Sequence, residues 1–244
     1  MTDGLLLIHG WPLDASMWAD QVSALQGDLP VMAPNMPGFG GAPPGGAVLG
    51  MDAGAAAATG AVADAGLDRV VVCGLSMGGY VGLALWRRHR ELVSGFVFAN
   101  TRAAADDEAG KERRRAVAER LRAEGNRFLV ESPPPLLSED ADPQLWRKVK
   151  DGIAAQPAEA IAAAAVGMAE RPDSTGDLAT IDVPTLVVTG SGDTLIPPDA
   201  TRPMAEGIRG ARFEVIDAAG HLSNLERPDR FTELLREHLR ACGL

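Results

Sequence analysis

The sequence predicts an α/β domain built on a mostly parallel sheet of about six strands, and three observations lead to this prediction. Short apolar runs alternate with helical stretches along the chain. Most of these runs are continuously apolar, which is typical of parallel strands covered by helices on both faces. A chain of 244 residues, 46% of them hydrophobic, is long enough for one large domain of this kind. The apolar runs lie at residues 5–9, 31–34, 70–73, 95–100, 185–189 and 212–216.

The first hundred residues follow a regular order of strands and helices. Strands are expected at 5–9 and 31–34. Residues 40–60 are rich in Gly, Ala and Pro, which indicates a loop followed by a weakly specified helix. The strand at 70–73 then leads through a glycine-rich turn into an apolar stretch at 80–86, which predicts a buried helix.

Residues 101–179 interrupt this order because they contain no convincing strand. Helices are expected over residues 103–125, 142–153 and 157–169. The prolines at 133–135 require an extended backbone between them. Since insertions of this length are typical of functional lids, we expect a core formed by residues 1–100 and 180–244 and a helical cap formed by 101–179.

Charge and cysteine content limit the partners and the compartment. The net charge of −10 argues against nucleic acid as a partner. No apolar run reaches the ~18 residues of a membrane span, and a strand that begins at residue 5 leaves no room for a signal peptide. Cys73 falls in a buried strand and Cys242 near the C-terminus. We therefore expect no disulfide, no membrane partner and a cytoplasmic location.

The strand at 70–73 runs into the pattern G-x-S-x-G, formed by Gly74, Ser76 and Gly78. This arrangement predicts a nucleophile elbow, in which a tight turn lifts a serine hydroxyl to the mouth of a cleft. Glycines are needed there because side chains on either side would clash with the strained turn. The alternative is a glycine-rich turn that carries an ordinary serine.

A serine nucleophile needs a base and an acid that orients the base. His221 follows the last expected strand and Asp193 follows the strand at 185–189, so both fall at the carboxyl edge of the sheet. The order Ser76, Asp193, His221 is that of nucleophile, acid and base in one known arrangement. The alternatives are a histidine packed into its loop and an aspartate that caps a turn. His89 and His238 lie in charged helical stretches, and we expect both at the surface.

The segment His9-Gly10-Trp11-Pro12 follows the first strand and is expected beside the elbow. An oxyanion hole needs two N–H donors aimed at the developing charge. Pro12 has no N–H, so we expect the donors to be the backbone groups of Trp11 and Met77, with His9 positioning the loop.

With these motifs the sequence resembles the α/β-hydrolase superfamily of serine esterases and lactonases, above all bacterial carboxylesterases and 3-oxoadipate enol-lactonase-like hydrolases. The resemblance covers nearly the whole chain, in a shortened form with about six strands. It implies an α/β-hydrolase fold with a helical cap, Ser76 as nucleophile, His221 as base, Asp193 as acid and an oxyanion hole at Trp11 and Met77. The motifs are His9-Gly10-Trp11-Pro12, Asn35-Met36-Pro37-Gly38-Phe39-Gly40, Gly74-Leu75-Ser76-Met77-Gly78-Gly79, Gly190-Ser191-Gly192-Asp193, and the segment from Gly220 to Pro228.

The function expected from this reasoning is hydrolysis of a small ester or lactone through an acyl-enzyme, without a metal or organic cofactor. Two alternatives remain open. One is carbon–carbon bond hydrolysis or cofactor-free perhydrolysis on the same triad. The other is a ligand receptor on a hydrolase scaffold, because fold does not settle function. A monomer and a homodimer are both compatible with the sequence.

The substrate pocket is the least specified part of the site. The apolar candidates for its lining are Phe128, Leu136, Trp146, Met168, Ile196 and Leu222. They either form an acyl pocket or pack the cap against the core. No cationic cluster is evident that could hold a carboxylate, apart from Arg102 as a single candidate. The run Lys111-Glu112-Arg113-Arg114-Arg115 is interpreted as a solvated helix face with Glu/Arg pairs.

Overall fold

The computed structural model describes residues 2–244, and it confirms the expected α/β architecture. The sheet has six strands in the order β2-β1-β3-β4-β5-β6, and each neighbouring pair is parallel. Their continuous apolar runs suit this arrangement, since helices cover both faces. The strands are β1 (Asp3–Ile8), β2 (Val31–Met32), β3 (Arg69–Leu75), β4 (Val93–Ala99), β5 (Thr185–Gly190) and β6 (Arg212–Ile216).

Most strand bounds differ from the sequence-based expectation by one or two residues, and two of the differences have a clear cause. The edge strand β2 has two residues, where 31–34 had been expected. Pro34 has no N–H to donate to a neighbouring strand, so the pairing cannot continue through it. Strand β4 begins at Val93, two residues before the expected start, because Val93 pairs with Val70 of β3 across a register shift at Ser94.

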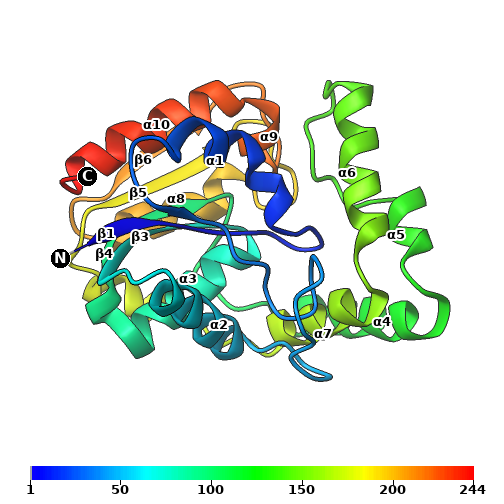
Figure 1. Ribbon diagram of the computed structural model, residues 1–244. Helices are drawn as coiled ribbons and strands as arrows, with labels where there is room; N and C mark the ends of the chain where they lie inside the picture. The colour runs from blue at the N-terminus through cyan, green and yellow to red at the C-terminus, as the bar shows by residue number, and fades with distance from the viewer. Residues whose placement is uncertain (1) are drawn as a thin grey trace.

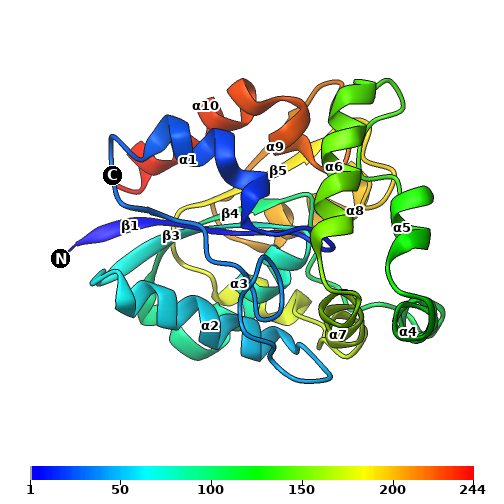
Figure 2. The ribbon, with the colours of Figure 1, turned by 45° about the vertical axis from the view of Figure 1, so that its right-hand side comes forward.

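Helices lie on both faces of the sheet. Figures 1 and 2 show α1 and α10 on one face and α2 and α3 on the other. The α-helices are α1 (Ala19–Leu25), α2 (Met51–Asp64), α3 (Met77–His89), α4 (Glu108–Glu124), α5 (Arg127–Glu131), α6 (Pro143–Ala155), α7 (Ala158–Ala169), α8 (Pro198–Gly207), α9 (Ser223–Glu226) and α10 (Pro228–Ala241). Short 3₁₀ turns occur at Ala15–Trp18, Arg90–Leu92 and Thr175–Thr180.

Residues 101–179 form α4 to α7 and contribute no strand to the sheet that the structure describes. In both views these helices stand beside the carboxyl ends of the strands, and α4 packs against α7. Helix α4 begins at Glu108 and not at residue 103, because Asp107 caps it by accepting a 2.7 Å hydrogen bond from the Gly110 N–H. The helices are therefore placed where they can contact groups at the strand ends.

Within residues 2–244, no single helix has both the length and the apolar character needed to cross a membrane. Helices α6 and α7 meet both criteria only when they are taken together, across a bend of 95°.

The expectation that His238 lies at the surface is wrong, since the residue is only 2% exposed. It belongs to an apolar stripe on α10 in which Phe231, Leu234, Leu235 and Leu239 also face inward. This is the i, i+3, i+4, i+7 spacing of a helix packed on a sheet. The charged neighbours of His238 in the sequence occupy the opposite side of the helix and concealed its position.

Candidate active site

Ser76 occupies the turn between β3 and α3 with φ +54° and ψ −112°, a conformation that costs a non-glycine residue roughly 1–3 kcal/mol. Two hydrogen bonds hold the turn. The Ser76 N–H donates to the Ala99 carbonyl at 2.9 Å, and Thr101 Oγ1 donates to the Ser76 carbonyl at 2.8 Å. A Cβ on Gly74 would lie 2.3 Å from the Gly78 carbonyl oxygen, so the turn can close only around glycine. The serine side chain is thus fixed at the carboxyl end of a central strand.

Asp193 and His221 meet at the same edge of the sheet, after β5 and β6. His221 Nδ1 lies 2.9 Å from Asp193 Oδ2, and both side chains are buried. The other carboxylate oxygen, Oδ1, accepts 2.9 Å hydrogen bonds from the N–H groups of Leu195 and Ile196. A carboxylate that accepts on both oxygens favours a proton on Nδ1 of the imidazole.

The opposite nitrogen of this imidazole, His221 Nε2, is buried and has no hydrogen-bond partner within residues 2–244. A buried polar atom without a partner is unusual and calls for an explanation. With the proton on Nδ1, Nε2 carries a lone pair that can accept a proton from a hydroxyl group. Hydrogen bonds between a catalytic serine and histidine are often long before substrate binds. The absence of a Ser76 contact at Nε2 is therefore compatible with a role of this atom as the base.

Sequence reasoning missed the role of Asn100, which follows β4 and is fully buried. Its Nδ2 donates to Asp193 Oδ2 at 2.9 Å and to the Gly220 carbonyl at 3.2 Å. Its Oδ1 accepts a 2.6 Å hydrogen bond from Ser223 Oγ. A single amide therefore holds the acid and both sides of the His221 loop. The available signal was a polar residue directly after a buried central strand.

The loop after β1 lies against the Ser76 turn, since a Cβ on Gly10 would be 3.5 Å from Ser76 Cβ. His9 is buried beneath the loop, and its Nε2 accepts a 3.0 Å hydrogen bond from the Met36 N–H. Burial lowers the pKa of His9 from 6.5 to about 4, so the ring is neutral and can accept at Nε2. The expected positioning role of His9 agrees with these contacts.

Trp11 and Met77, the expected oxyanion donors, lie on the two segments that meet at this turn. Met77 is the first residue of α3, so its N–H has no partner within the helix. Within residues 2–244, the Trp11 N–H also makes no backbone hydrogen bond. The Trp11 indole Nε1 donates instead to the Ile161 carbonyl on α7 at 3.0 Å. The loop is therefore anchored through its side chain, which leaves its amide free.

A cavity of about 530 Å³ opens beside Ser76 between the sheet edge and the helices of residues 101–179. Its lining residues are Trp11, Ser76, Tyr80, Arg102, Asp106, Gly110, Arg113, Arg114, Val117, Phe128, Leu129, Ser132, Pro133, Pro134, Ala165, Met168, Leu195 and Ile196. This volume is in the range of cavities that hold small organic ligands. Phe128, Met168 and Ile196 of the expected apolar lining are in the set.

Leu136, Trp146 and Leu222, the other three expected lining residues, are not among the residues that line this cavity. The Leu222 N–H donates to the Leu136 carbonyl at 2.8 Å, and both side chains are buried. They join the His221 loop to the extended segment before α6. Trp146 lies on α6 and packs, partly buried, against the hydrophobic core.

Arg102, the single cationic candidate expected from the sequence, is not the only arginine in the cavity lining. Arg113 and Arg114 line the cavity together with Arg102. On α4 the two arginines belong to a lining stripe with Gly110 and Val117, spaced i, i+3, i+4 and i+7. Periodicity was the signal that could have revealed them. Lys111 and Arg115 do belong to the expected solvated face of the helix, where they pair with Glu108 and Glu112.

The described residues contain no group of three or more His, Cys, Asp or Glu side chains arranged to hold a metal ion. Both cysteines are free thiols.

The chain is similar to known proteins that are named as esterases and lactonases. A model of the alpha/beta hydrolase family matches residues 5–234. The chain is 31% identical over 247 residues to a pimeloyl-(acyl-carrier protein) methyl ester esterase of Neisseria meningitidis, a match that covers 95% of this chain and 90% of that protein. It is 32% identical over 172 residues to 3-oxoadipate enol-lactonase 1 of Acinetobacter baylyi, across 69% of this chain and 63% of the lactonase. A solved structure of a thermophilic esterase from Thermogutta terrifontis, with malate bound, has a TM-score of 0.94 at 41% identity and covers 99% of this chain and 92% of its own.

Proposed function

The chain belongs to the alpha/beta hydrolase family, and from this premise we propose that it hydrolyses carboxylic esters or lactones through an acyl-enzyme formed on Ser76. One observation carries the proposal. The buried pair of Asp193 and His221 lies at the sheet edge that also bears Ser76, and it leaves Nε2 of the imidazole without a partner. A receptor would not need a buried base that is oriented by a carboxylate yet unused.

The proposed reaction begins when Ser76 Oγ attacks the substrate carbonyl while His221 Nε2 takes the hydroxyl proton. Asp193 holds the imidazole in the required tautomer and stabilises the imidazolium that forms. The N–H groups of Trp11 and Met77 donate to the oxyanion of the tetrahedral intermediate. His221 then protonates the leaving alcohol, and the acyl group remains on Ser76.

Deacylation reverses these roles. His221 removes a proton from a water molecule that attacks the acyl carbonyl, and the proton returns to Ser76 Oγ as the acid departs. No step uses a metal or an organic cofactor. The relatives support this reaction class, because their names describe hydrolysis of a methyl ester and of an enol-lactone. The cytoplasmic location and the choice between monomer and homodimer stay predictions.

The test is covalent labelling by a fluorophosphonate, combined with hydrolysis of p-nitrophenyl esters and simple lactones. The wild type is expected to label at one serine and to turn over esters, whereas Ser76→Ala is expected to do neither and to remain folded. Ser23→Ala, an exposed serine on α1, is the matched control and should behave as the wild type. Labelling without cleavage of any ester or lactone would favour carbon–carbon hydrolysis or perhydrolysis. Neither labelling nor turnover would favour the receptor.

A further inference from the structure

The charged side chains that line the cavity beside Ser76 are three arginines, Arg102, Arg113 and Arg114, and one aspartate, Asp106. The cavity wall therefore has a surplus of positive charge, although the chain as a whole carries −10. The family's hydrolytic chemistry needs only the triad and the oxyanion donors. Bond cleavage itself therefore does not account for the arginines.

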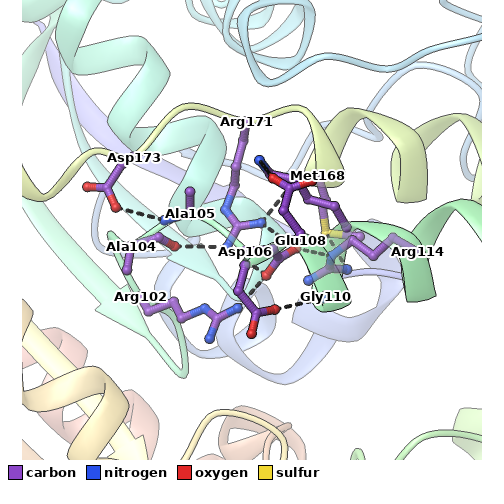
Figure 3. Close-up of polar contacts among 12 residues, drawn as sticks. Arg102, Ala104, Ala105, Asp106, Glu108, Gly110, Arg114, Met168, Arg171 and Asp173 are labelled. Carbon is purple, nitrogen blue, oxygen red and sulfur yellow. Dashed lines mark hydrogen bonds and ion pairs between the residues drawn. The ribbon is translucent and has the colours of Figure 1, made fainter.

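Asp106 fixes the position of two of these arginines (Figure 3). Its side chain is only 4% exposed. Oδ1 accepts from Arg102 Nη2 and, at 3.2 Å, from Arg171 Nη2, whereas Oδ2 accepts from Arg114 Nε at 2.5 Å and from Arg171 Nη1 at 2.9 Å. Burial raises the pKa of Asp106, but the hydrogen bonds and charges of Arg171 and Arg114 outweigh it and hold the pKa well below its usual range. The carboxylate is thus a permanent anion at the centre of the cluster.

Arg171 anchors the cluster from behind. Its guanidinium lies 4.1 Å from the centroid of the Tyr80 ring, and its side chain is almost completely buried. It also donates to the carbonyls of Met168 at 2.7 Å and Ala104 at 2.9 Å. Arg171 Nη1 and Nη2 donate to the protein itself, and Arg171 does not line the cavity. Arg102 and Arg114 are therefore the arginines of this cluster that face the cavity.

The single Asp106 carboxylate cannot neutralise these charges. Arg113 forms no ion pair within residues 2–244, in contrast to its neighbours Lys111 and Arg115. Arg102 Nε is buried and has no hydrogen-bond partner in the same part of the chain. Arg113 is exposed and the Arg102 side chain is 33% exposed, so the cavity offers solvated cationic groups with unused donors to which an anion can bind. Asp173, which accepts from the Ala105 N–H at 3.2 Å, still leaves the arginines in excess.

We propose that this cavity selects esters or lactones whose acyl part carries a free carboxylate, which binds to Arg102, Arg113 and Arg114 while the reacting carbonyl lies at Ser76. This proposal rests on the hydrolase function proposed above. A planar guanidinium matches a carboxylate with two parallel hydrogen bonds. Apolar side chains from the same lining, Phe128 and Val117, suit a short methylene spacer between the two ends of the substrate. Half-esters of short dicarboxylic acids have this chemistry.

The first experiment compares matched pairs of methyl esters in a pH-stat. Monomethyl succinate, glutarate and adipate are paired with methyl butyrate, pentanoate and hexanoate. The kcat/KM of each half-ester is expected to exceed that of its neutral partner by roughly ten-fold or more, because a hydrogen-bonded ion pair is retained only by the acid. The ratio should fall as sodium chloride is raised, since the arginines are partly exposed.

Variants on α4 assign the preference to a residue. Arg113→Glu is expected to abolish the ratio between half-ester and neutral ester. Arg115→Glu changes the net charge equally on the same helix, but it lies outside the cavity lining and should keep the wild-type ratio. A ratio near one in the wild type, or equal ratios in the two variants, overturns the proposal while ester hydrolysis still stands.

A binding measurement decides the proposal even if no ester is cleaved. Isothermal titration of Ser76→Ala with glutarate should give heat of binding, and titration with the neutral glutaramide should give none. Adding Arg113→Glu should remove glutarate binding, whereas adding Arg115→Glu should not. Absence of glutarate binding, or binding that survives Arg113→Glu, rejects the carboxylate site. The hydrolase proposal is judged separately, by fluorophosphonate labelling.

Discussion

Asn100 donates its side-chain N–H to Asp193 Oδ2 over 2.9 Å, the same oxygen that accepts from His221 Nδ1 at 2.9 Å. The carboxylate therefore has a donor on each side of Oδ2, besides the two backbone N–H groups on Oδ1. Asn100 directly follows β4, and Asp193 lies in the turn after β5. The contact ties the acid to a neighbouring strand and fixes the direction in which it presents its charge to the imidazole.

Asn100→Gly should lower kcat for ester hydrolysis roughly ten- to a hundred-fold and leave KM nearly unchanged. A hydrogen bond to a charged group is worth about 1.5–3 kcal/mol, and each 1.4 kcal/mol lost from the transition state is about ten-fold in rate. Glycine is chosen because residue 100 has φ +46°, which alanine would strain. Steady-state kinetics and urea unfolding of the same sample separate a positioning effect from loss of fold. A loss of stability with kcat intact would limit Asn100 to a structural role.

Asp193→Asn should reduce the rate by about 10⁴-fold, because an amide can neither hold the imidazole in its working tautomer nor stabilise the imidazolium. The exposed residues Asp199 and Asp217 are close in sequence and serve as controls for the same change. Single-turnover hydrolysis of a p-nitrophenyl ester gives the measurement. Near-wild-type activity in Asp193→Asn would require another acid for His221.

Met168→Ala and Phe128→Ala should change the preference among acyl chain lengths, because both side chains line the cavity beside Ser76. A pocket methylene is worth about 1–3 kcal/mol of discrimination, so ratios between short and long esters should shift by roughly ten-fold or more. Trp146→Ala is the contrast. The Trp146 side chain packs against the hydrophobic core and does not line the cavity. The substitution should therefore lower the melting temperature and leave the ratio between short and long esters unchanged. If Trp146→Ala shifts the ratio instead, the acyl pocket extends beneath α6.

The strand ends that carry Ser76, Asp193 and His221 could be placed from the sequence, because continuous apolar runs and glycine turns are local signals. Asn100 could not be assigned a role in the same way. Its partners come from segments about 90 and 120 residues further along the chain, and only the strand order brings them together.

The arginine cluster escaped prediction for a related reason. Arg113 and Arg115 have the same chemistry and differ only in the side of α4 that they occupy. The helical spacing places Arg113 on the same side of α4 as Gly110 and Val117, but which side faces the cavity depends on the packing of α7 against α4. Asp106 has an ordinary sequence context, and its burial depends on Arg171, 65 residues away. Charge patterns therefore predict helices better than they predict which charges become part of a site.

Stability should decline as the pH falls from 7 to 5, because two buried histidines resist protonation in the folded protein. Burial lowers the pKa of His9 to about 4, and burial together with the charge of Arg212 lowers that of His238 to about 4. Both groups have a usual value of 6.5 in the unfolded chain. Below pH 6.5 the two histidines are protonated in the unfolded state but remain neutral in the folded state. The stability present above this pH is therefore lost progressively toward pH 4. The slope is at most about 1.4 kcal/mol per pH unit for each histidine.

Urea unfolding at pH 7, 6 and 5 measures this dependence. The window lies mainly above the titration of the carboxylates with lowered pKa values, which contribute only from about pH 5 downward. His238→Gln should remove one of the two protons and so flatten the decline by about half. His89→Gln, which changes a half-buried histidine at the end of α3, is the control and should leave the slope unchanged. If His238→Gln and the wild type lose stability in parallel between pH 7 and 5, then His238 is protonated in the folded protein and its burial does not exclude the charge. The slope that remains in His238→Gln would then belong to His9 and to groups other than His238.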